Sequence, residues 1–302
     1  MNAENELDYR ALVERLEDIG EKSPYVHISY IGATVMGRRI PLVTIGNKDA
    51  KKGVLYVSTH HATENICTSV MLNFIEDYAS LISTGKYACG INTRVLHEMR
   101  RICIIPMLNP DGVEYRLHGV DESNPLKERL LQYNGGWDFN LWNANGRGVD
   151  LNHNYNAGFD EYKRIECESG ITPGRSRYSG ESPESEPEVS AITEYINSNI
   201  DVIDGILTFH TQGEEIFYKS MGYEAPGSAF LAKRIAKMTG YRISCAEGLA
   251  SYGGLTDWFV RKYNKPSFTI ECGKGKNPLG VSQISSIYLK LRETLYTFPI
   301  LI

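Results

Sequence analysis

The sequence predicts a single-domain α/β protein built around a mostly parallel sheet, and three observations lead to it. Apolar runs that each end in a polar cluster recur along the chain, as in GVLYVSTHH, RICIIPMLNP, DGILTFHTQG and PSFTIECGKG. Segments with helical spacing of apolar residues separate these runs. No interdomain linker or repeat interrupts the 302 residues. Because strands that alternate with helices are typical of parallel sheets covered on both faces, we expect one α/β domain over residues 1–302.

The N-terminal elements are expected to be a helix and a hairpin. Residues 6–20 carry apolar positions at helical spacing. Two β-rich runs follow at residues 25–32 and 38–46, separated by a short loop that contains Gly37. Such a pair of runs predicts an antiparallel hairpin.

Beyond the hairpin, buried-strand and helix patterns alternate. The expected strands are residues 53–61, 101–110, 204–213 and 266–275, and the expected helices are residues 67–81, 185–199, 227–240 and 282–298. Ser185 and Glu188 have the spacing of a capping box at the start of the helix 185–199. Residues 117–177 lack periodicity, and a loop this long inside a compact domain is usually functional or disordered.

Composition limits the classes of partner. With 42% hydrophobic and 23% charged residues, the chain has the composition of a soluble globular protein. A formal net charge of -5 favours neither nucleic acid nor an anionic membrane, so we expect small molecules or peptides as partners. The N-terminus MNAENELDYR lacks the features of a secretory signal, which predicts a cytoplasmic protein. Six cysteines without a CxxC pair predict free, mostly buried thiols. The oligomeric state has no signal in the sequence.

Three potential metal ligands stand at the ends of predicted strands. His61 and Glu64 are three residues apart after the run GVLYVS, and His210 ends the run GILTFH. A catalytic zinc ion takes three such protein ligands and keeps one position open. The pair His61 and Glu64 alone also suits a surface turn with a hydrogen-bonded histidine, and the neighbouring His60 leaves open which imidazole would bind.

Glu271 adds a possible general base. It closes the run SFTIE, again at a strand end, where a carboxylate can take a proton from water beside a metal. An ion pair with Lys274 is the alternative. Because the carboxyl ends of parallel strands share one edge, we expect His61, Glu64, His210 and Glu271 to meet there, which favours a metal-dependent hydrolase.

The ordered phrases HHATEN, NPDGVE, RGVDLNHNYNAGF, FHTQGE and SFTIECG resemble the zinc carboxypeptidase (M14) family over nearly the whole chain. The resemblance implies an α/β/α sandwich with a mixed, mostly parallel, eight-stranded sheet. It also implies one zinc ion per chain on His61, Glu64 and His210, with Glu271 as the general base.

Within that family, three phrases resemble the bacterial γ-D-glutamyl-L-diamino acid endopeptidases. They are WNANGRGVDLNHNYNAGF, RYSGESPESEPE and IECGKGKNPLG. Enzymes of this branch cut peptidoglycan stem peptides between γ-D-glutamate and meso-diaminopimelate or lysine. The resemblance therefore implies a metallopeptidase that acts on peptide or muropeptide substrates.

The resemblance also implies roles for residues of the long loop. Arg147 matches the residue that stabilises the oxyanion in bacterial members, although a solvated loop arginine is the alternative. Asn152 matches the family's asparagine for the substrate carboxylate, and Asp150 is expected to order the loop or a metal-bound histidine. His153 departs from the pattern, because digestive carboxypeptidases have an arginine there that clamps the terminal carboxylate. This departure favours an altered or extended substrate.

Two residues of the segment ASYGGLTDW complete the expected substrate site. Tyr252 is the candidate for the family's mobile tyrosine, although it stands directly before the two glycines rather than further ahead. Thr256 falls near the position that lines the specificity pocket of relatives.

Three alternatives to the cell-wall endopeptidase stay open from the sequence. A general metallocarboxypeptidase would remove C-terminal residues from ordinary peptides. A zinc acyl-amino-acid hydrolase would share the His-x-x-Glu pair and a late histidine. A pseudoenzyme would bind peptides or muropeptides without cutting them, but the matched ligands and the base are intact, which favours an enzyme.

Overall fold

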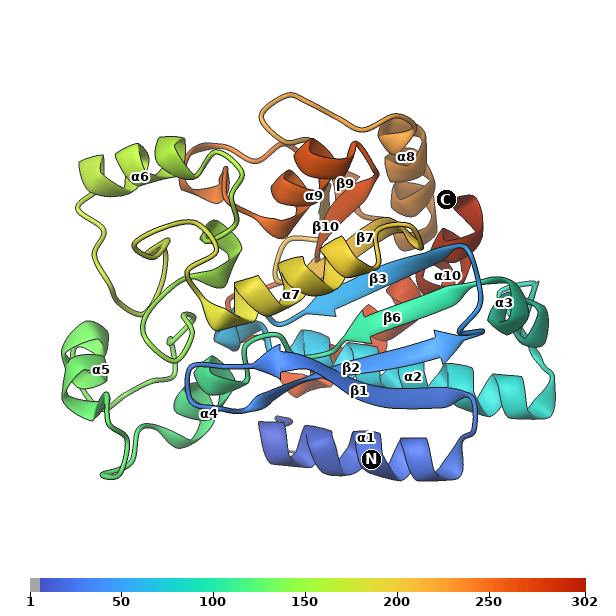
Figure 1. Cartoon of the computed structure of the whole chain (residues 1–302), viewed down its shortest axis with the longest axis horizontal. Helices are drawn as coiled ribbons and strands as arrows, with labels where there is room; N and C mark the ends of the chain where they lie inside the picture. The colour runs from blue at the N-terminus through green and yellow to red at the C-terminus, as the bar shows by residue number, and fades with distance from the viewer. Residues whose placement is uncertain (1–5) are drawn as a thin grey trace.

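An eight-stranded sheet forms the middle layer of the protein, in a computed structural model that describes residues 6–302 (Figure 1). The strand order is β1-β2-β6-β3-β7-β10-β8-β9. These strands are β1 (Val26–Ala33), β2 (Arg39–Gly46), β3 (Gly53–Ser58), β6 (Arg101–Ile105), β7 (Ile203–His210), β8 (Glu215–Phe217), β9 (Arg242–Ile243) and β10 (Ser267–Glu271). Two short strands outside this sheet, β4 (Tyr87–Ala88) and β5 (Ile91–Asn92), pair with each other.

The sheet is mixed and its centre is parallel. The strands β6, β3, β7 and β10 all run in the same direction. At one edge, β1 and β2 form the hairpin predicted for residues 25–32 and 38–46, and β2 runs antiparallel to β6. At the other edge, β8 runs antiparallel to β10 and parallel to β9. The predicted α/β class with a mostly parallel sheet is therefore confirmed.

Helices cover both faces of the sheet, because successive side chains of a strand point to opposite faces. Val54 and Tyr56 of β3 belong to a buried cluster that includes residues of α1, α2, α8 and α10, whereas Leu55 and Val57 belong to one that includes residues of α7 and α9. Figure 1 shows α7 in front of the sheet and α2 behind it. The helices are α1 (Tyr9–Lys22), α2 (Ile66–Thr84), α3 (Thr93–Met99), α4 (Pro110–His118), α5 (Lys127–Asn134), α6 (Phe159–Glu168), α7 (Pro187–Ser198), α8 (Ser228–Thr239), α9 (Leu255–Tyr263) and α10 (Ile284–Leu301).

Several short helices lie where the sequence did not predict them. Residues 117–177, expected as a loop, contain α5, α6 and a 3-10 turn, η2 (Leu151–His153). The helices α3 and α9 were also missed; α9 begins directly after Gly253 and Gly254. Helices of seven to ten residues span too few turns to give a strong periodic pattern, which explains these misses.

The predicted capping box is wrong. α7 begins at Pro187, and its N-cap residue Glu186 makes no side-chain cap hydrogen bond. Ser185 Oγ donates instead to the Glu186 carboxylate at 2.8 Å, and the buried Glu188 accepts from Asn145 Nδ2 at 3.2 Å. Proline at the first helical position has no N–H to satisfy, so a side-chain cap is less needed. Ser185 and Glu188 therefore form hydrogen bonds outside the helix instead of capping it.

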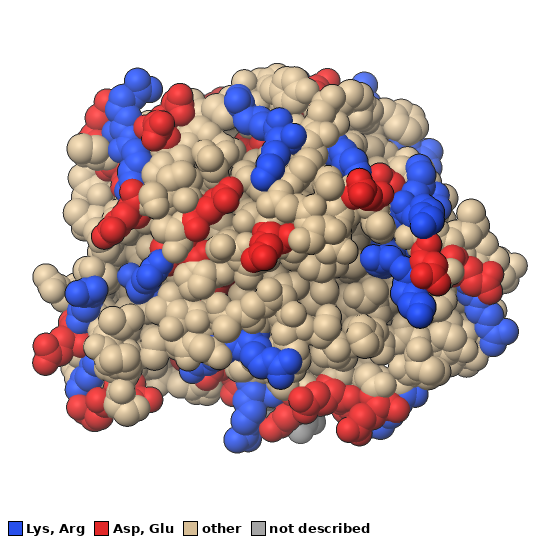
Figure 2. Space-filling model, viewed as in Figure 1, with Lys and Arg blue, Asp and Glu red and all other residues tan. Residues whose placement is uncertain are grey.

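The surface charges and the burial of the cysteines can be compared with what the composition predicts. Figure 2 shows acidic and basic side chains interspersed over the face that it draws. No helix within residues 6–302 combines the length and the apolar character needed to cross a membrane. All six cysteines are free, as predicted, but only half of them are buried, namely Cys67, Cys103 and Cys272.

The carboxyl ends of β3, β7 and β10 meet at one edge of the sheet. His210 is the last residue of β7 and pairs in register with Glu271, the last residue of β10. β3 ends at Ser58, and the 3-10 turn η1 (Ala62–Glu64) follows it closely. The fold thus brings His61, Glu64, His210 and Glu271 to the same edge.

Candidate active site

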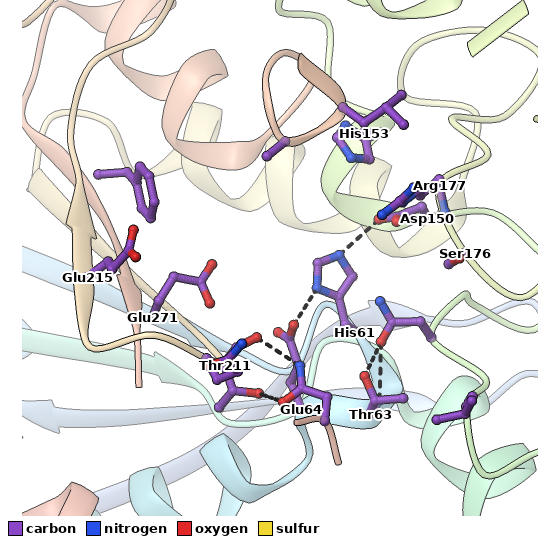
Figure 3. A pocket seen from close by; sticks show the side chains of 17 residues that line it. His61, Thr63, Glu64, Asp150, His153, Ser176, Arg177, Thr211, Glu215 and Glu271 are labelled. Atoms are coloured by element: carbon purple, nitrogen blue, oxygen red, sulfur yellow. Dashed lines mark hydrogen bonds and ion pairs between the residues drawn. The ribbon is translucent and has the colours of Figure 1, made fainter. Parts of the chain in front are cut away.

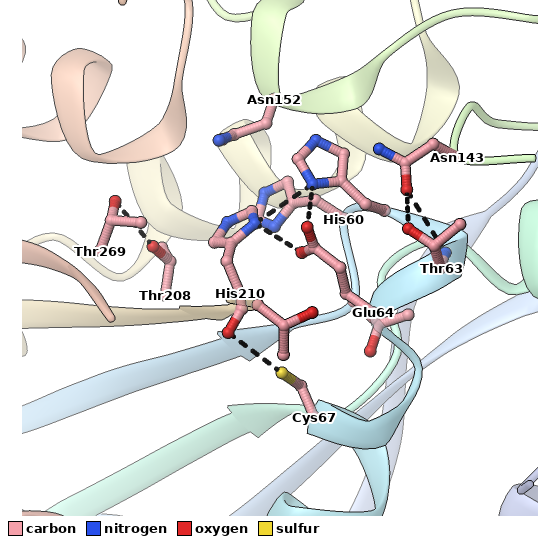
Figure 4. Close-up of polar contacts among 12 residues, drawn as sticks. His60, Thr63, Glu64, Cys67, Asn143, Asn152, Thr208, His210 and Thr269 are labelled. Carbon is pink, nitrogen blue, oxygen red and sulfur yellow. Dashed lines mark hydrogen bonds and ion pairs between the residues drawn. The ribbon is translucent and has the colours of Figure 1, made fainter. Parts of the chain in front are cut away.

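Three side chains with metal-binding chemistry converge beyond β3 and β7 (Figure 4). His61 Nδ1 lies 3.0 Å from Glu64 Oε1, and His210 Nδ1 lies 2.9 Å from Glu64 Oε2. The two Nδ1 atoms are 3.3 Å apart. Each carboxylate oxygen of Glu64 therefore faces one imidazole, and four possible ligand atoms gather in one place.

This spacing fits a zinc ion. Nitrogens about 2.0–2.1 Å from a tetrahedral ion stand roughly 3.3 Å apart, which is the separation of the His61 and His210 Nδ1 atoms. Two imidazoles and one carboxylate are a known donor set of catalytic zinc sites. Burial acts to raise the pKa of Glu64, but His61 and His210 outweigh it and hold that pKa below its ordinary value. The carboxylate is therefore charged and suited to a cation.

Asp150 holds His61 from the side away from the ligand cluster. His61 Nε2 lies 3.0 Å from Asp150 Oδ1. The same carboxylate accepts hydrogen bonds from the backbone N–H groups of Asn152, at 3.2 Å, and Arg177, at 3.0 Å. Burial acts to raise the pKa of Asp150, but His61, His153 and the hydrogen bond from the Arg177 N–H hold it well below its usual range. An anion on the far nitrogen fixes the tautomer that presents Nδ1 to a metal.

His60 lies beside the cluster and has a different partner. Its Nε2 is 2.9 Å from the Tyr155 hydroxyl, and its ring stacks on His210 with centroids 5.3 Å apart. Burial and the neighbouring histidines lower the pKa of His60 well below its ordinary value. The geometry therefore favours His61 over His60 as the metal ligand.

Glu271 shares a cavity of about 670 Å³ with His61 and Glu64 (Figure 3). Burial, followed by the charge of Glu64, raises the pKa of Glu271 well above its ordinary value. Lys274, the alternative partner, instead lies 3.1 Å from Glu214. A carboxylate with a raised pKa at the edge of an open cavity suits proton transfer.

A second cavity, of about 100 Å³, adjoins the first, because Glu271 lines both. Asn152, Tyr252 and Thr256 line this smaller cavity, so three of the predicted substrate-binding residues share it. Lys219 lies on its wall as well. The smaller cavity is therefore the natural place for the part of a substrate next to Glu271.

Asn152 and Thr256 differ in whether they have a polar group free to bind a ligand. Asn152 Oδ1 accepts from the backbone N–H of Leu255 at 3.2 Å, so its NH₂ group remains to donate to a ligand. Thr256 Oγ1 lies 3.1 Å from Ser267 Oγ and 3.0 Å from Thr269 Oγ1. Thr256 thus shapes the wall of the cavity while its hydroxyl is already engaged.

His153 lines the larger cavity as a fixed, neutral ring. Its ring stacks on Tyr162 with centroids 3.9 Å apart, and its Nδ1 lies 2.9 Å from the Tyr252 carbonyl. Burial lowers the pKa of His153 despite the charge of Asp150. Because a carbonyl only accepts, Nδ1 carries the proton, and Nε2 is left as a hydrogen-bond acceptor.

Arg147, expected to stabilise an oxyanion, lies outside both cavities. Its Nε and Nη2 donate to the Glu186 carboxylate at 2.7 and 3.0 Å, and Nη2 also donates to the Ser185 carbonyl at 2.8 Å. It lines a separate surface pocket beside α7. The buried carboxylate of Glu186 holds the guanidinium there, so its position does not support a role at the reacting bond.

Arg177 is a cavity residue that the sequence did not single out. It lines the larger cavity with His61, Asp150 and Glu271. Its place in the phrase RYSGESPESEPE was the only signal, because no local pattern marks a loop arginine as facing a site.

Comparisons with known proteins agree with this geometry. The family model described as zinc carboxypeptidase matches residues 12–294. Gamma-D-glutamyl-L-diamino acid endopeptidase 1 from Lysinibacillus sphaericus is 30% identical over 289 residues, which cover 95% of this chain and 71% of that protein. Carboxypeptidase B from Rattus norvegicus is 26% identical over 259 residues, which cover 80% of this chain and 57% of that protein.

Solved structures share the fold at low sequence identity. Bovine thrombin-activatable fibrinolysis inhibitor, in complex with tick carboxypeptidase inhibitor, has a TM-score of 0.74 at 19% identity, covering 99% of this chain and 98% of that one. Murein-tripeptide amidase MpaA from Escherichia coli O157 has a TM-score of 0.55 at 17% identity, covering 90% of this chain and 92% of that one. The match over residues 12–294 includes the metal-ligand cluster and Glu271, and the chain therefore belongs to the zinc carboxypeptidase family.

Proposed function

We propose that this chain is a zinc-dependent endopeptidase that cuts the amide between γ-D-glutamate and meso-diaminopimelate, or lysine, in peptidoglycan stem peptides. The observation that carries the proposal is the convergence of His61, Glu64 and His210 beside Glu271 at one cavity. The choice of substrate is supported by 30% identity to gamma-D-glutamyl-L-diamino acid endopeptidase 1.

His61, Glu64 and His210 would hold one zinc ion, which when bound supplies a Lewis acid that polarises the scissile carbonyl. Glu271 acts as the general base and takes a proton from the attacking water. As it does so, the water oxygen forms its bond to the carbonyl carbon, and Glu271 then returns the proton to the amine nitrogen as the C–N bond breaks. Asp150 keeps His61 in the tautomer that presents Nδ1 to the ion.

The state of His153 supports an endopeptidase over a strict carboxypeptidase. A terminal carboxylate is best held by a bidentate donor such as arginine. His153 offers a neutral ring whose free nitrogen accepts hydrogen bonds, so it cannot donate to a carboxylate. Asn152 is left with a single NH₂ donor, which also suits the carbonyl of a chain that continues.

The smaller cavity supports diaminopimelate on the amine side of the bond. The side chain of diaminopimelate ends in both an ammonium and a carboxylate. Lys219, which also lies 3.5 Å from Glu224, and Asp257 line the cavity and differ in the sign of their charge. This pairing suits a zwitterionic end group better than the single ammonium of lysine.

The test uses purified protein of known zinc content with L-Ala-γ-D-Glu-meso-diaminopimelate and, separately, a set of ordinary peptides. Zinc-dependent release of diaminopimelate alone is the expected result. Release of C-terminal residues from ordinary peptides alone would make the chain a general carboxypeptidase. Zinc binding with no cleavage of either would favour a binding protein.

Replacing the base provides the internal control. Glu271→Gln should keep the zinc content and lower kcat by about 10²- to 10⁴-fold, because the proton acceptor is lost. The matched control is Glu161→Gln, which changes an exposed carboxylate on α6 that lines neither cavity. It should retain most of the activity. Near-normal kcat in Glu271→Gln would refute the assigned role.

A further inference from the structure

Arg177 is held in place by its backbone rather than by its side chain. Its φ of 69° lies in the left-handed region, which a residue other than glycine adopts at a cost. Its N–H donates to Asp150 Oδ2 at 3.0 Å, and its carbonyl accepts from the Tyr162 hydroxyl at 2.7 Å. Asp150 is also the carboxylate that orients His61. The strained residue is thus fixed to the group that positions the metal ligand.

The guanidinium of Arg177 has no internal partner. Within residues 6–302, no carboxylate lies within ion-pair distance of it, and no hydrogen bond from its side chain is formed. The carboxylates that share its cavity are otherwise engaged or on the other wall. Glu64 and Asp150 face His61, and Glu215 pairs with Arg242. A permanent cation therefore lines the cavity and is available to an anion of the substrate.

Arg177 lies on the side of the cavity where the acyl part of a substrate would bind. Figure 3 shows Arg177 beside Asp150, on the wall opposite Glu215 and Glu271. Glu271 must reach the leaving amine, and the smaller cavity begins on its side. The residue that contributes the amine therefore lies toward the smaller cavity. The acyl residue extends the other way, toward Arg177.

A γ-linked glutamyl residue places a carboxylate on that acyl side. In an ordinary peptide, the backbone carboxyl of the acyl residue is the scissile carbonyl itself. In a γ-glutamyl amide, the scissile carbonyl belongs to the side chain, so the α-carboxylate stays free a few bonds away. A guanidinium on the acyl side can bind this group through paired hydrogen bonds.

We infer that Arg177 binds the free α-carboxylate of the γ-linked glutamate and thereby selects γ-glutamyl substrates. The inference rests on the proposed function. It differs from an oxyanion role, because an oxyanion forms on every amide substrate, whereas a free α-carboxylate is present only on some.

A matched pair of substrates separates these roles. One is L-Ala-γ-D-Glu-meso-diaminopimelate, and the other carries a carboxamide in place of the α-carboxylate of glutamate. The wild type should prefer the carboxylate in kcat/KM by about 10- to 100-fold, the range of a charged hydrogen bond. Arg177→Gln should reduce this preference to within about threefold, because kcat/KM should fall only for the substrate with the free α-carboxylate. Arg177→Lys should keep part of it.

The control and a binding readout complete the test. Arg175→Gln removes an exposed arginine from the same loop that lines neither cavity, and it should leave the preference unchanged. Calorimetry should show that the product L-Ala-D-Glu binds the wild type more tightly than its α-amide, and that Arg177→Gln abolishes the difference. Zinc content should match in all variants, since the Arg177 contact to Asp150 is through the backbone.

Equal losses on both substrates in Arg177→Gln would overturn the inference in favour of an oxyanion or structural role. A wild type that cuts both substrates equally would overturn it as well, while leaving the proposed function intact. A zinc-loaded wild type that cuts neither substrate would refute the proposed function and this inference together.

Discussion

Asp150→Asn is expected to weaken zinc binding by about 10- to 100-fold, or about 1.4–2.7 kcal/mol. Asp150 is 3% exposed, and its carboxylate faces His61 Nε2 and the backbone N–H groups of Asn152 and Arg177. Asparagine has a single acceptor oxygen, so its NH₂ group must face one of these donors. A buried donor left without an acceptor costs about 1–3 kcal/mol of folding free energy in addition.

Two measurements follow the effects of this variant separately. Competition with a fluorescent chelator gives the zinc affinity, and urea unfolding of the zinc-free protein gives the free energy of unfolding. Asp160→Asn, which changes an exposed carboxylate on α6, is the matched control and should alter neither. If Asp150→Asn bound zinc as tightly as the wild type, the reasoning that Asp150 orients His61 would be refuted.

Three further changes test the smaller cavity and the buried charges beside α7. Lys219→Met should lower kcat/KM about 10-fold for diaminopimelate substrates and little for lysine substrates, because it removes the cation for the side-chain carboxylate; equal losses would contradict this. Arg147→Gln should lower the free energy of unfolding by about 1–3 kcal/mol and leave kcat within about threefold, because the buried Glu186 loses its cationic partner and keeps only the hydrogen bonds from Asn145 and Ser185; a large fall in kcat at unchanged stability would restore the oxyanion role. Burial raises the pKa of Glu188 from 4.5 to about 8. Its contribution to stability is therefore full below pH 4.5 and is lost as the pH rises toward 8. Between pH 5.5 and 7.5, the wild type should lose about 2–3 kcal/mol relative to Glu188→Gln in urea unfolding, and parallel pH curves would argue against the raised pKa.

The metal cluster was predictable because its signals are local. Each apolar run of the central sheet is long enough to predict a buried strand, and the polar residue after it must lie at the carboxyl edge. The pattern places His210 and Glu271 at one edge, and the parallel pairing of β7 with β10 in the assembled sheet makes them neighbours. His61 and Glu64 follow from a tight turn after β3. Pattern and topology together determine the side chains of the candidate metal site.

The arginines show where such reasoning stops. Arg147 and Arg177 both lie in irregular loops. In such loops, the spacing of residues in the sequence does not predict which way a side chain points. Arg147 forms an ion pair with Glu186, 39 residues away in the sequence. Glu186 is buried at the start of α7, which packs on the sheet. Arg177 lines the cavity with its backbone in the left-handed region. The sequence does not predict this conformation for a residue other than glycine. Both positions depend on tertiary contacts that follow from the assembled fold.

Backbone contacts also tie down the wall around Arg177. Backbone hydrogen bonds join the two loops that form it: Ala144 to Arg175 at 3.0 Å, Asp150 to Tyr178 at 2.7 Å, and Glu184 to Asn154 at 2.6 Å. Arg147 secures the first loop to Glu186 at the start of α7. Because the wall is already ordered, little binding energy is lost in arranging it. Because Arg147 contacts Glu186 and Ser185 and lines neither cavity, its loss should affect stability rather than turnover.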